Sequence, residues 1–174
     1  MQKRAEKIAL SAIGGSVCLI FVILAYYIKN ISISLNALAS VGLMLPMSKQ
    51  YYKESLYAYL AVCILGAFFV NINILAFVFL GGLFPLAAIY FFHKDIPPQK
   101  RYIAYLIFAI VTFFIYYTVF KAMFLESLAT IKMAKRFWLY PLANILYFAA
   151  LLLYEYILLM VYGEVVKLLK RIRR

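Results

Sequence analysis

Acidic residues are scarce in this sequence, which has six Asp and Glu against 18 Lys and Arg, together with one histidine and two cysteines. The carboxylates are too scattered to form the pair that general acid–base catalysis uses. His93 lies in a polar loop with no cluster of metal ligands around it, and Cys18 and Cys63 are isolated in apolar runs. The motifs of hydrolases, zinc proteases, phosphate-binding loops and dinucleotide-binding folds are also missing. We therefore expect a protein that is not an enzyme, with no catalytic residue, no cofactor and no bound metal.

Apolar residues are abundant instead. They make up 68% of the chain, whose mean hydropathy is +0.96, whereas soluble domains hold roughly 45–50%. A chain of 174 residues then has room for one membrane domain, and any source of energy must come from partners. The net charge of +12 would suit a nucleic-acid binder, but Lys and Arg lie at the ends of apolar runs. We expect membrane lipids, and no nucleic acid, to balance this charge.

Six apolar segments can be recognised, at about residues 8–28, 35–48, 55–70, 74–92, 102–124 and 137–163. The third and fourth come from residues 55–92, a run of 38 residues without a charge. As one helix this run would extend about 57 Å, against a hydrocarbon core of roughly 30 Å. The run must fold back, and Asn71 to Asn73 is the natural turn. Gly81, Gly82 and Pro85 indicate a tight contact or a bend in its second half.

The second segment is short enough to be re-entrant. The distribution of Lys and Arg indicates whether it spans the membrane. If it spans, both termini lie on one side with 13 of the 18 Lys and Arg; if it does not, the split is 7 inside to 11 outside, against the positive-inside rule. We therefore predict an all-α membrane protein. Its fold is a compact bundle of six transmembrane helices with both termini cytoplasmic. It forms a single integral domain over residues 1–174, multi-pass in a bacterial plasma membrane.

Polar and aromatic residues on the predicted external side indicate a binding surface. A pocket with aromatic walls, a few amides and cations would suit a small aromatic or anionic solute, although Trp and Tyr at helix ends also form the usual interfacial belt. The external loops further carry Asn71 and Asn73. The candidate ligand-binding residues are Lys29, Asn30, Asn36, Lys132, Lys135, Arg136, Trp138, Tyr140 and Asn144.

Glu155 is the only acidic residue inside a long apolar run, and it shares a helix face with Asn144, Phe148 and Leu151. A charge at the bilayer centre costs at least roughly 2.5–3.5 kcal/mol, so such residues usually face the interior of a bundle. Glu155 lies about 13 Å along the helix from Glu164, in the cytoplasmic half and within reach of a long basic side chain. Two roles stay open for Glu155: contact with a ligand, and a structural hydrogen bond to a tyrosine with a packing or coupling role. Asn144, nearer the external surface, is the better ligand candidate.

Small residues recur at four-residue steps in the first segment, a spacing that lets another helix approach closely in a bilayer. Packing within the chain and contact with another subunit would both use such a face. The candidate contact residues are Ala5, Ala9, Ala12 and Ser16.

The order of these features resembles the substrate-binding (S) components of energy-coupling-factor (ECF) transporters. The resemblance rests on residues 7–12 (KIALSA), the polar loop before residues 38–46 (LASVGLMLP), residues 53–61 (KESLYAYLA) and the basic tail. It implies a six-helix subunit that captures a vitamin-like small molecule for an ABC-type importer. Such a subunit would dock through the small residues of its first helix to a transmembrane coupling subunit that works with two ATPases. The external loops and the last three helices would hold the ligand.

The rod-shape-determining membrane protein of the cell-wall elongation machinery is similar in size and fold, and it transports nothing. A non-transporting membrane scaffold of the cell-envelope machinery therefore stays the alternative function.

Overall fold

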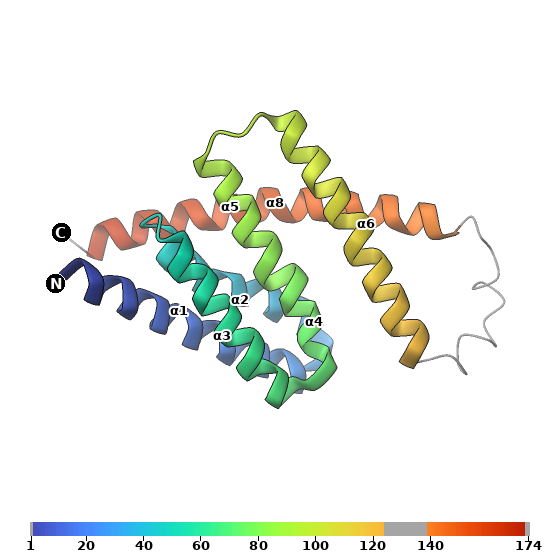
Figure 1. Cartoon of the computed structure of the whole chain (residues 1–174), viewed down its shortest axis with the longest axis horizontal. Coiled ribbons are helices and arrows are strands. Elements are labelled where there is room, and N and C mark those ends of the chain that lie inside the picture. The colour runs from blue at the N-terminus through green and yellow to red at the C-terminus, as the bar shows by residue number, and fades with distance from the viewer. Residues whose placement is uncertain (1, 124–138, 173–174) are drawn as a thin grey trace. The chain divides into compact units, whose positions relative to one another are not determined.

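A computed structural model describes residues 2–123 and 139–172 of the chain. All regular elements in these ranges are helical, which confirms the predicted all-α class (Figure 1). The elements are α1 (Gln2–Tyr27), the 3-10 turn η1 (Lys29–Ile31), α2 (Ser32–Met47), α3 (Tyr52–Val70), the 3-10 turn η2 (Asn71–Asn73), α4 (Ile74–Ala76), the π-helical η3 (Phe77–Leu83), α5 (Phe84–His93), α6 (Pro98–Met123) and α8 (Leu139–Ile172).

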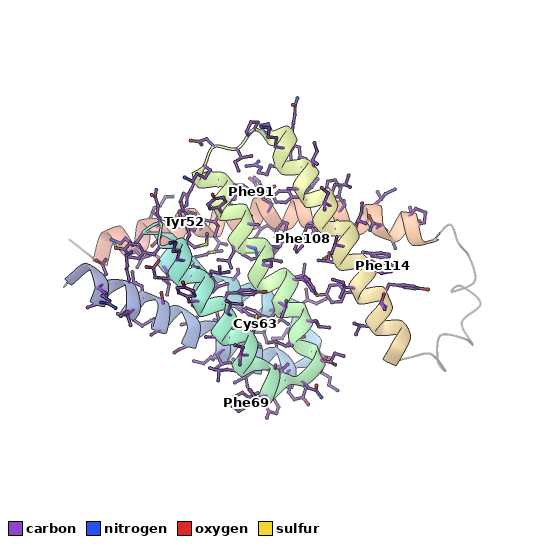
Figure 2. All side chains as sticks on the ribbon, viewed as in Figure 1. Tyr52, Cys63, Phe69, Phe91, Phe108 and Phe114 are labelled. Carbon is purple, nitrogen blue, oxygen red and sulfur yellow. The ribbon has the colours of Figure 1, made fainter. Side chains whose placement is uncertain are left out.

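Within the described residues, five helical stretches are long and apolar enough to cross a membrane. They are Arg4–Tyr27, Lys29–Met47, Tyr52–His93, Pro98–Val119 and Pro141–Leu169. Large apolar side chains such as Phe69 and Phe114 point away from the helices, with exposed fractions of 61% and 68% (Figure 2). Such a surface suits acyl chains and not water. The chain is therefore a helical protein of the multi-pass membrane type.

The longest of these stretches, Tyr52–His93, reverses direction in its middle (Figure 1). α3 ends at Val70, and Asn71 then adopts φ 53° and ψ −138°. A positive φ is uncommon outside glycine, and asparagine tolerates it better than most residues. The two arms pack together, because the hydroxyl of Tyr59 donates to the carbonyl of Val78 at 3.2 Å. This is the turn that the length of the charge-free run predicted.

The second arm contains the π-helical segment η3, at the glycine pair that indicated a tight contact. The N–H of Phe84 donates to the carbonyl of Phe79, five residues earlier, and Pro85 has no N–H to continue the ordinary ladder. A Cβ on Gly81 would press on the backbone carbonyl of Asn36, and one on Gly82 would overlap the ring of Tyr59. The arm can approach α2 and α3 this closely only because both positions are glycine.

The described residues form two compact units. Unit 1 consists of Met1–Lys94 and Ile157–Arg174, and unit 2 of Asp95–Tyr156, so that α8 contributes to both. The prediction of a single domain stays a prediction.

In unit 1, α1 and α2 cross with their backbones in contact. A Cβ on Gly14 would overlap the carbonyl oxygen of Gly42, and a Cβ on Gly42 would overlap that of Gly14. Beside this crossing the thiol of Cys18 donates to the carbonyl of Ala39 at 2.8 Å. Cys18, Ala39 and Leu43 are completely buried. The crossing is therefore the centre of the core of unit 1.

One end of unit 1, here called the ion-pair end, gathers helix termini. Lys7 near the start of α1 lies 3.1 Å from Glu54 in the first turn of α3, and Lys49 after α2 lies 3.7 Å from Glu6. The hydroxyl of Tyr162 on α8 donates to the carbonyl of Met47, the last residue of α2, at 3.3 Å. α1 and α3 therefore start at this end, where α2 finishes.

Candidate functional site: a polar cleft in unit 1

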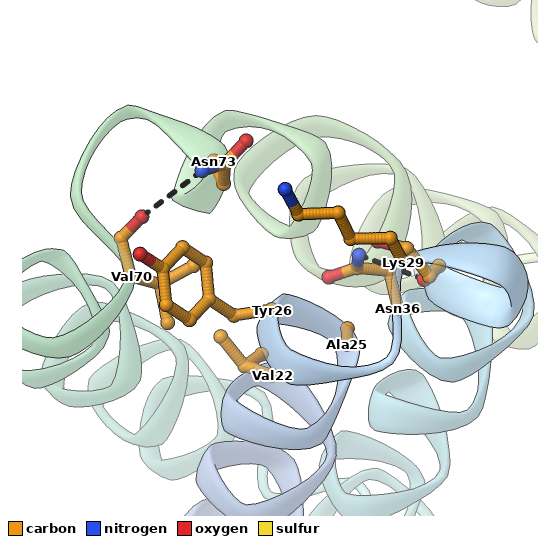
Figure 3. Close-up of a pocket in the computed structure, with 8 residues that line it drawn as sticks. Val22, Ala25, Tyr26, Lys29, Asn36, Val70 and Asn73 are labelled. Atoms are coloured by element: carbon orange, nitrogen blue, oxygen red, sulfur yellow. Dashed lines mark hydrogen bonds between the residues drawn. The ribbon is translucent and has the colours of Figure 1, made fainter.

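A cleft with a volume of about 330 Å³ lies at the other end of unit 1 (Figure 3). It forms where α1 passes through η1 into α2, beside the turn that joins α3 to α4. The lining residues are Val22, Ala25, Tyr26, Lys29, Ser32, Asn36, Val70 and Asn73. Two chain reversals meet here, and this brings polar residues of separate loops to one place.

Two asparagines place their amide groups at the cleft. Asn36, only 5% exposed, lies one turn into α2, and its Nδ2 donates to the carbonyl of Ser32 at 2.9 Å (Figure 3). Asn73 makes a longer contact of the same kind, 3.5 Å from Nδ2 to the carbonyl of Val70. Because a carboxamide nitrogen only donates and its oxygen only accepts, each residue keeps its Oδ1 as a free acceptor for a ligand.

Lys29 supplies the positive charge of the cleft. Its side chain is exposed, and in Figure 3 its Nζ extends over the opening between Asn73 and Asn36. In the described part of the chain, no carboxylate lies within ion-pair distance of Lys29, since the four ion pairs there involve other residues. The ammonium is therefore available to an anion from solution.

The remaining walls are apolar. Val22, Ala25 and Val70 are 3% exposed or less and close the inner side of the cleft, while Tyr26 stands half-exposed at its rim. An apolar wall with a few convergent polar groups is the usual form of a small-molecule site. The cleft therefore has the form of a site for a small solute.

The structure brings together two of the predicted ligand residues, Lys29 and Asn36. Asn30 is exposed and does not line the cleft, and Asn144 is half-buried on α8 within unit 2. The other predicted residues lie outside the described part of the chain or, for Tyr140, have a side chain outside it: Lys132, Lys135, Arg136, Trp138 and Tyr140. Ligand contact by all these residues stays a prediction.

The sequence reasoning missed Tyr26 and Ser32 as site residues. A usable signal existed, since Val22, Tyr26 and Lys29 follow at steps of four and three, the spacing of one helix face. Ser32 likewise precedes Asn36 by four. Val70 carries no such signal, because only the packing of α3 brings it to the cleft.

A second polar cluster lies in unit 2, between α6 and α8. The hydroxyl of Tyr105 donates to Oε1 of Glu155 at 2.9 Å, and Nε of Arg101 lies 3.2 Å from the same oxygen. The Nε–H is not aligned for a hydrogen bond, so we interpret the Arg101 contact as ionic. Glu155 is 5% exposed and Tyr105 is 1% exposed. The predicted tyrosine partner and basic neighbour of Glu155 are thus both confirmed.

A third polar cluster surrounds His93 at the ion-pair end, where the sequence had predicted a loop. The structure makes His93 the last residue of α5 and half-buries it. Tyr52 Oη lies 2.9 Å from its Nδ1, and Tyr162 Oη lies 2.9 Å from its Nε2. Because Tyr162 donates its proton to Met47, it accepts from Nε2–H, and Nδ1 accepts from Tyr52. The imidazole therefore joins α3, α5 and α8.

The small residues predicted to contact a partner helix lie on an exposed side of α1. Ala5, Ala9, Ala12 and Ser16 are all exposed, while Gly14 and Cys18 on another side are buried. Close packing within unit 1 therefore uses a different set of small residues from the one that the four-residue steps selected. Contact with a partner stays a prediction.

No protein-family model, no curated protein and no solved structure matches this chain.

Proposed function

We propose that this protein is a solute-capture subunit of an ECF-type importer in a bacterial plasma membrane. The observation that carries the proposal is the cleft of about 330 Å³, with Lys29 and two amide oxygens above an apolar wall. Pockets for small molecules have volumes of roughly 300–1,000 Å³ and combine the same kinds of group. The cleft sits at the lower end of this range, which suits a small solute.

The proposed topology has six transmembrane helices, both termini in the cytoplasm and the cleft open to the outside. It is supported by the reversal at Asn71, which lets the stretch Tyr52–His93 cross twice. It is also supported by the ion pairs of Lys7 and Lys49, because these place the ends of three helices together. The cytoplasmic side would then hold 13 of the 18 Lys and Arg.

Transport requires energy from partner subunits in this proposal. The exposed stripe of Ala5, Ala9, Ala12 and Ser16 would give a transmembrane coupling subunit a smooth surface for close approach. Partner ATPases at the cytoplasmic face would then drive a change that releases the solute. This coupling requires two conformations of the protein. The solute and the partner subunits must each bind one conformation more tightly than the other.

Thermal unfolding of the full-length protein in lipid nanodiscs, measured against a chemically diverse panel of small solutes, tests the proposal. We expect at least one anionic solute to raise the Tm, because a ligand that binds the folded state stabilises it. Lys29→Gln should remove the effect. Lys94→Gln, an exposed lysine at the ion-pair end of the same unit, is the matched control and should keep it.

A non-transporting scaffold is favoured by the same exposed stripe on α1, which suits any partner helix. Co-purification separates the two functions. Recovery of ATPase subunits supports the importer. Recovery of cell-wall synthases, together with the absence of any stabilising solute in the panel, would instead support the scaffold function.

A further inference from the structure

We infer that the cleft takes a small carboxylate that also carries an N–H or O–H donor. This inference rests on the proposed function, since it names the class of ligand that the same cleft would bind. It follows from the hydrogen-bonding capacity that the described part of the chain leaves unused at Lys29, Asn36 and Asn73.

The anionic part follows from Lys29. The carboxylates of Glu6, Glu54, Glu155 and Glu164 each pair with another basic residue. Beside an apolar wall, the attraction between an ammonium and an anion is stronger than in open water. A single lysine balances a single negative charge. A phosphate dianion would usually call for several donors or an arginine fork, so the cleft favours a carboxylate.

The donor part follows from the asparagines. The Nδ2 of Asn36 is held by its own helix at 2.9 Å, and this fixes the direction of its Oδ1. If the amide were turned by 180°, Oδ1 of Asn36 would face the carbonyl oxygen of Ser32, which is unfavourable. The helix therefore holds Oδ1 away from Ser32, where it can accept from a ligand. The Oδ1 of Asn73 is left free in the same way, although by a longer contact. A ligand that only accepts hydrogen bonds would remove these oxygens from water without replacing their partners, which is unfavourable.

The size of the ligand follows from the walls. Val22, Ala25 and Val70 provide a buried apolar wall, and the ring of Tyr26 stands at the rim. A volume near the lower limit for ligand pockets leaves room for a body of about one ring.

Three isosteric probes test these statements separately. Pyrrole-2-carboxylate carries the anion and an N–H donor, furan-2-carboxylate keeps the anion and replaces the donor by an acceptor, and pyrrole-2-carboxamide keeps the donor without the charge. Ligand-observed NMR with the full-length protein in nanodiscs detects binding in the millimolar range. We expect pyrrole-2-carboxylate to bind, and each of the other two to bind about tenfold more weakly or not at all.

Variants then place the binding in the cleft. Lys29→Gln should abolish binding of pyrrole-2-carboxylate, Lys29→Arg should retain it, and the control Lys94→Gln should leave it unchanged. Asn36→Leu, which removes one of the two acceptors, should reduce the preference for the pyrrole acid over the furan acid. The Tm of each variant without ligand shows whether it has folded.

The possible outcomes separate this inference from the proposed function. Equal binding of the two acids to the unaltered protein overturns the donor requirement, and equal binding of the carboxamide overturns the anion requirement. If none of the three probes binds while another solute stabilises the protein in a Lys29-dependent way, the ligand class is wrong and solute capture stands. If no solute of the panel binds, both fail.

Discussion

The close crossing of α1 and α2 at Gly14 and Gly42 lets us predict how much an added methyl group at Gly14 destabilises the protein. A methyl group at Gly14 would overlap the carbonyl oxygen of Gly42, and backbone atoms cannot rotate out of the way. Since ordinary carbon–oxygen contacts are about 3.3–3.6 Å, α1 and α2 would have to move apart by roughly 1 Å. Such a shift also lengthens the bond of 2.8 Å from Cys18 to Ala39.

Gly14→Ala should therefore lower the free energy of unfolding by about 1–3 kcal/mol for overpacking, with about 0.5–1 kcal/mol more for the weakened hydrogen bond. Gly163→Ala is the control, because in the described part of the chain no atom beyond its chain neighbours and its own helix backbone lies within 4 Å of the added Cβ. Alanine is a better helix former than glycine by up to about 1 kcal/mol, so the control should be neutral or stabilising.

Reversible unfolding in mixed micelles, followed by circular dichroism, measures both variants. A difference of about 1.5–5 kcal/mol between them is expected. Gly15→Ala adds a second control on α1 itself, since its Cβ would meet the Cβ of Ala58 at an ordinary 3.8 Å. If Gly14→Ala unfolds at the same denaturant concentration as the two controls, the close crossing is refuted.

Two further predictions concern the other polar clusters. Tyr105→Phe should destabilise the protein by about 1–3 kcal/mol, because it removes the hydroxyl that donates to the buried carboxylate of Glu155. The same unfolding assay measures it, and an unchanged stability would contradict the hydrogen bond. His93→Phe should cost about 1–2 kcal/mol by leaving Tyr52 and Tyr162 without the imidazole. A double-mutant cycle with Tyr52→Phe should show coupling, and strict additivity would show that the two side chains do not interact.

The sequence could predict those features that a bilayer forces on the chain. A charge-free run too long for one crossing has to turn, and the asparagines at positions 71 and 73 are the natural place for it. A buried carboxylate has to find a donor, so a tyrosine and a basic neighbour were expected for Glu155. Which of the 16 tyrosines it would be could not be predicted, because the choice depends on how α6 is placed along α8.

The face of α1 that packs inside the protein was harder to predict. Four-residue steps selected Ala5, Ala9, Ala12 and Ser16, which the structure exposes. The step from Gly14 to Cys18 has the same length, and these two residues lie on the buried side of α1. Small residues at four-residue steps show that a helix has a face that another helix can approach closely. Only the position of the neighbouring helix shows which of two such faces packs within the chain.

The glycine crossing also determines the geometry of the cleft. Lys29 follows α1 and Asn36 lies near the start of α2, so the distance between the cation and the acceptor depends on how closely these helices cross at Gly14 and Gly42. α2 itself is about 24 Å long, and its far end carries Met47, which is tied to α8 through Tyr162. A rigid helix held at its middle cannot move at one end without moving at the other. α2 therefore connects the cleft, through Asn36, with the ion-pair end, through Met47.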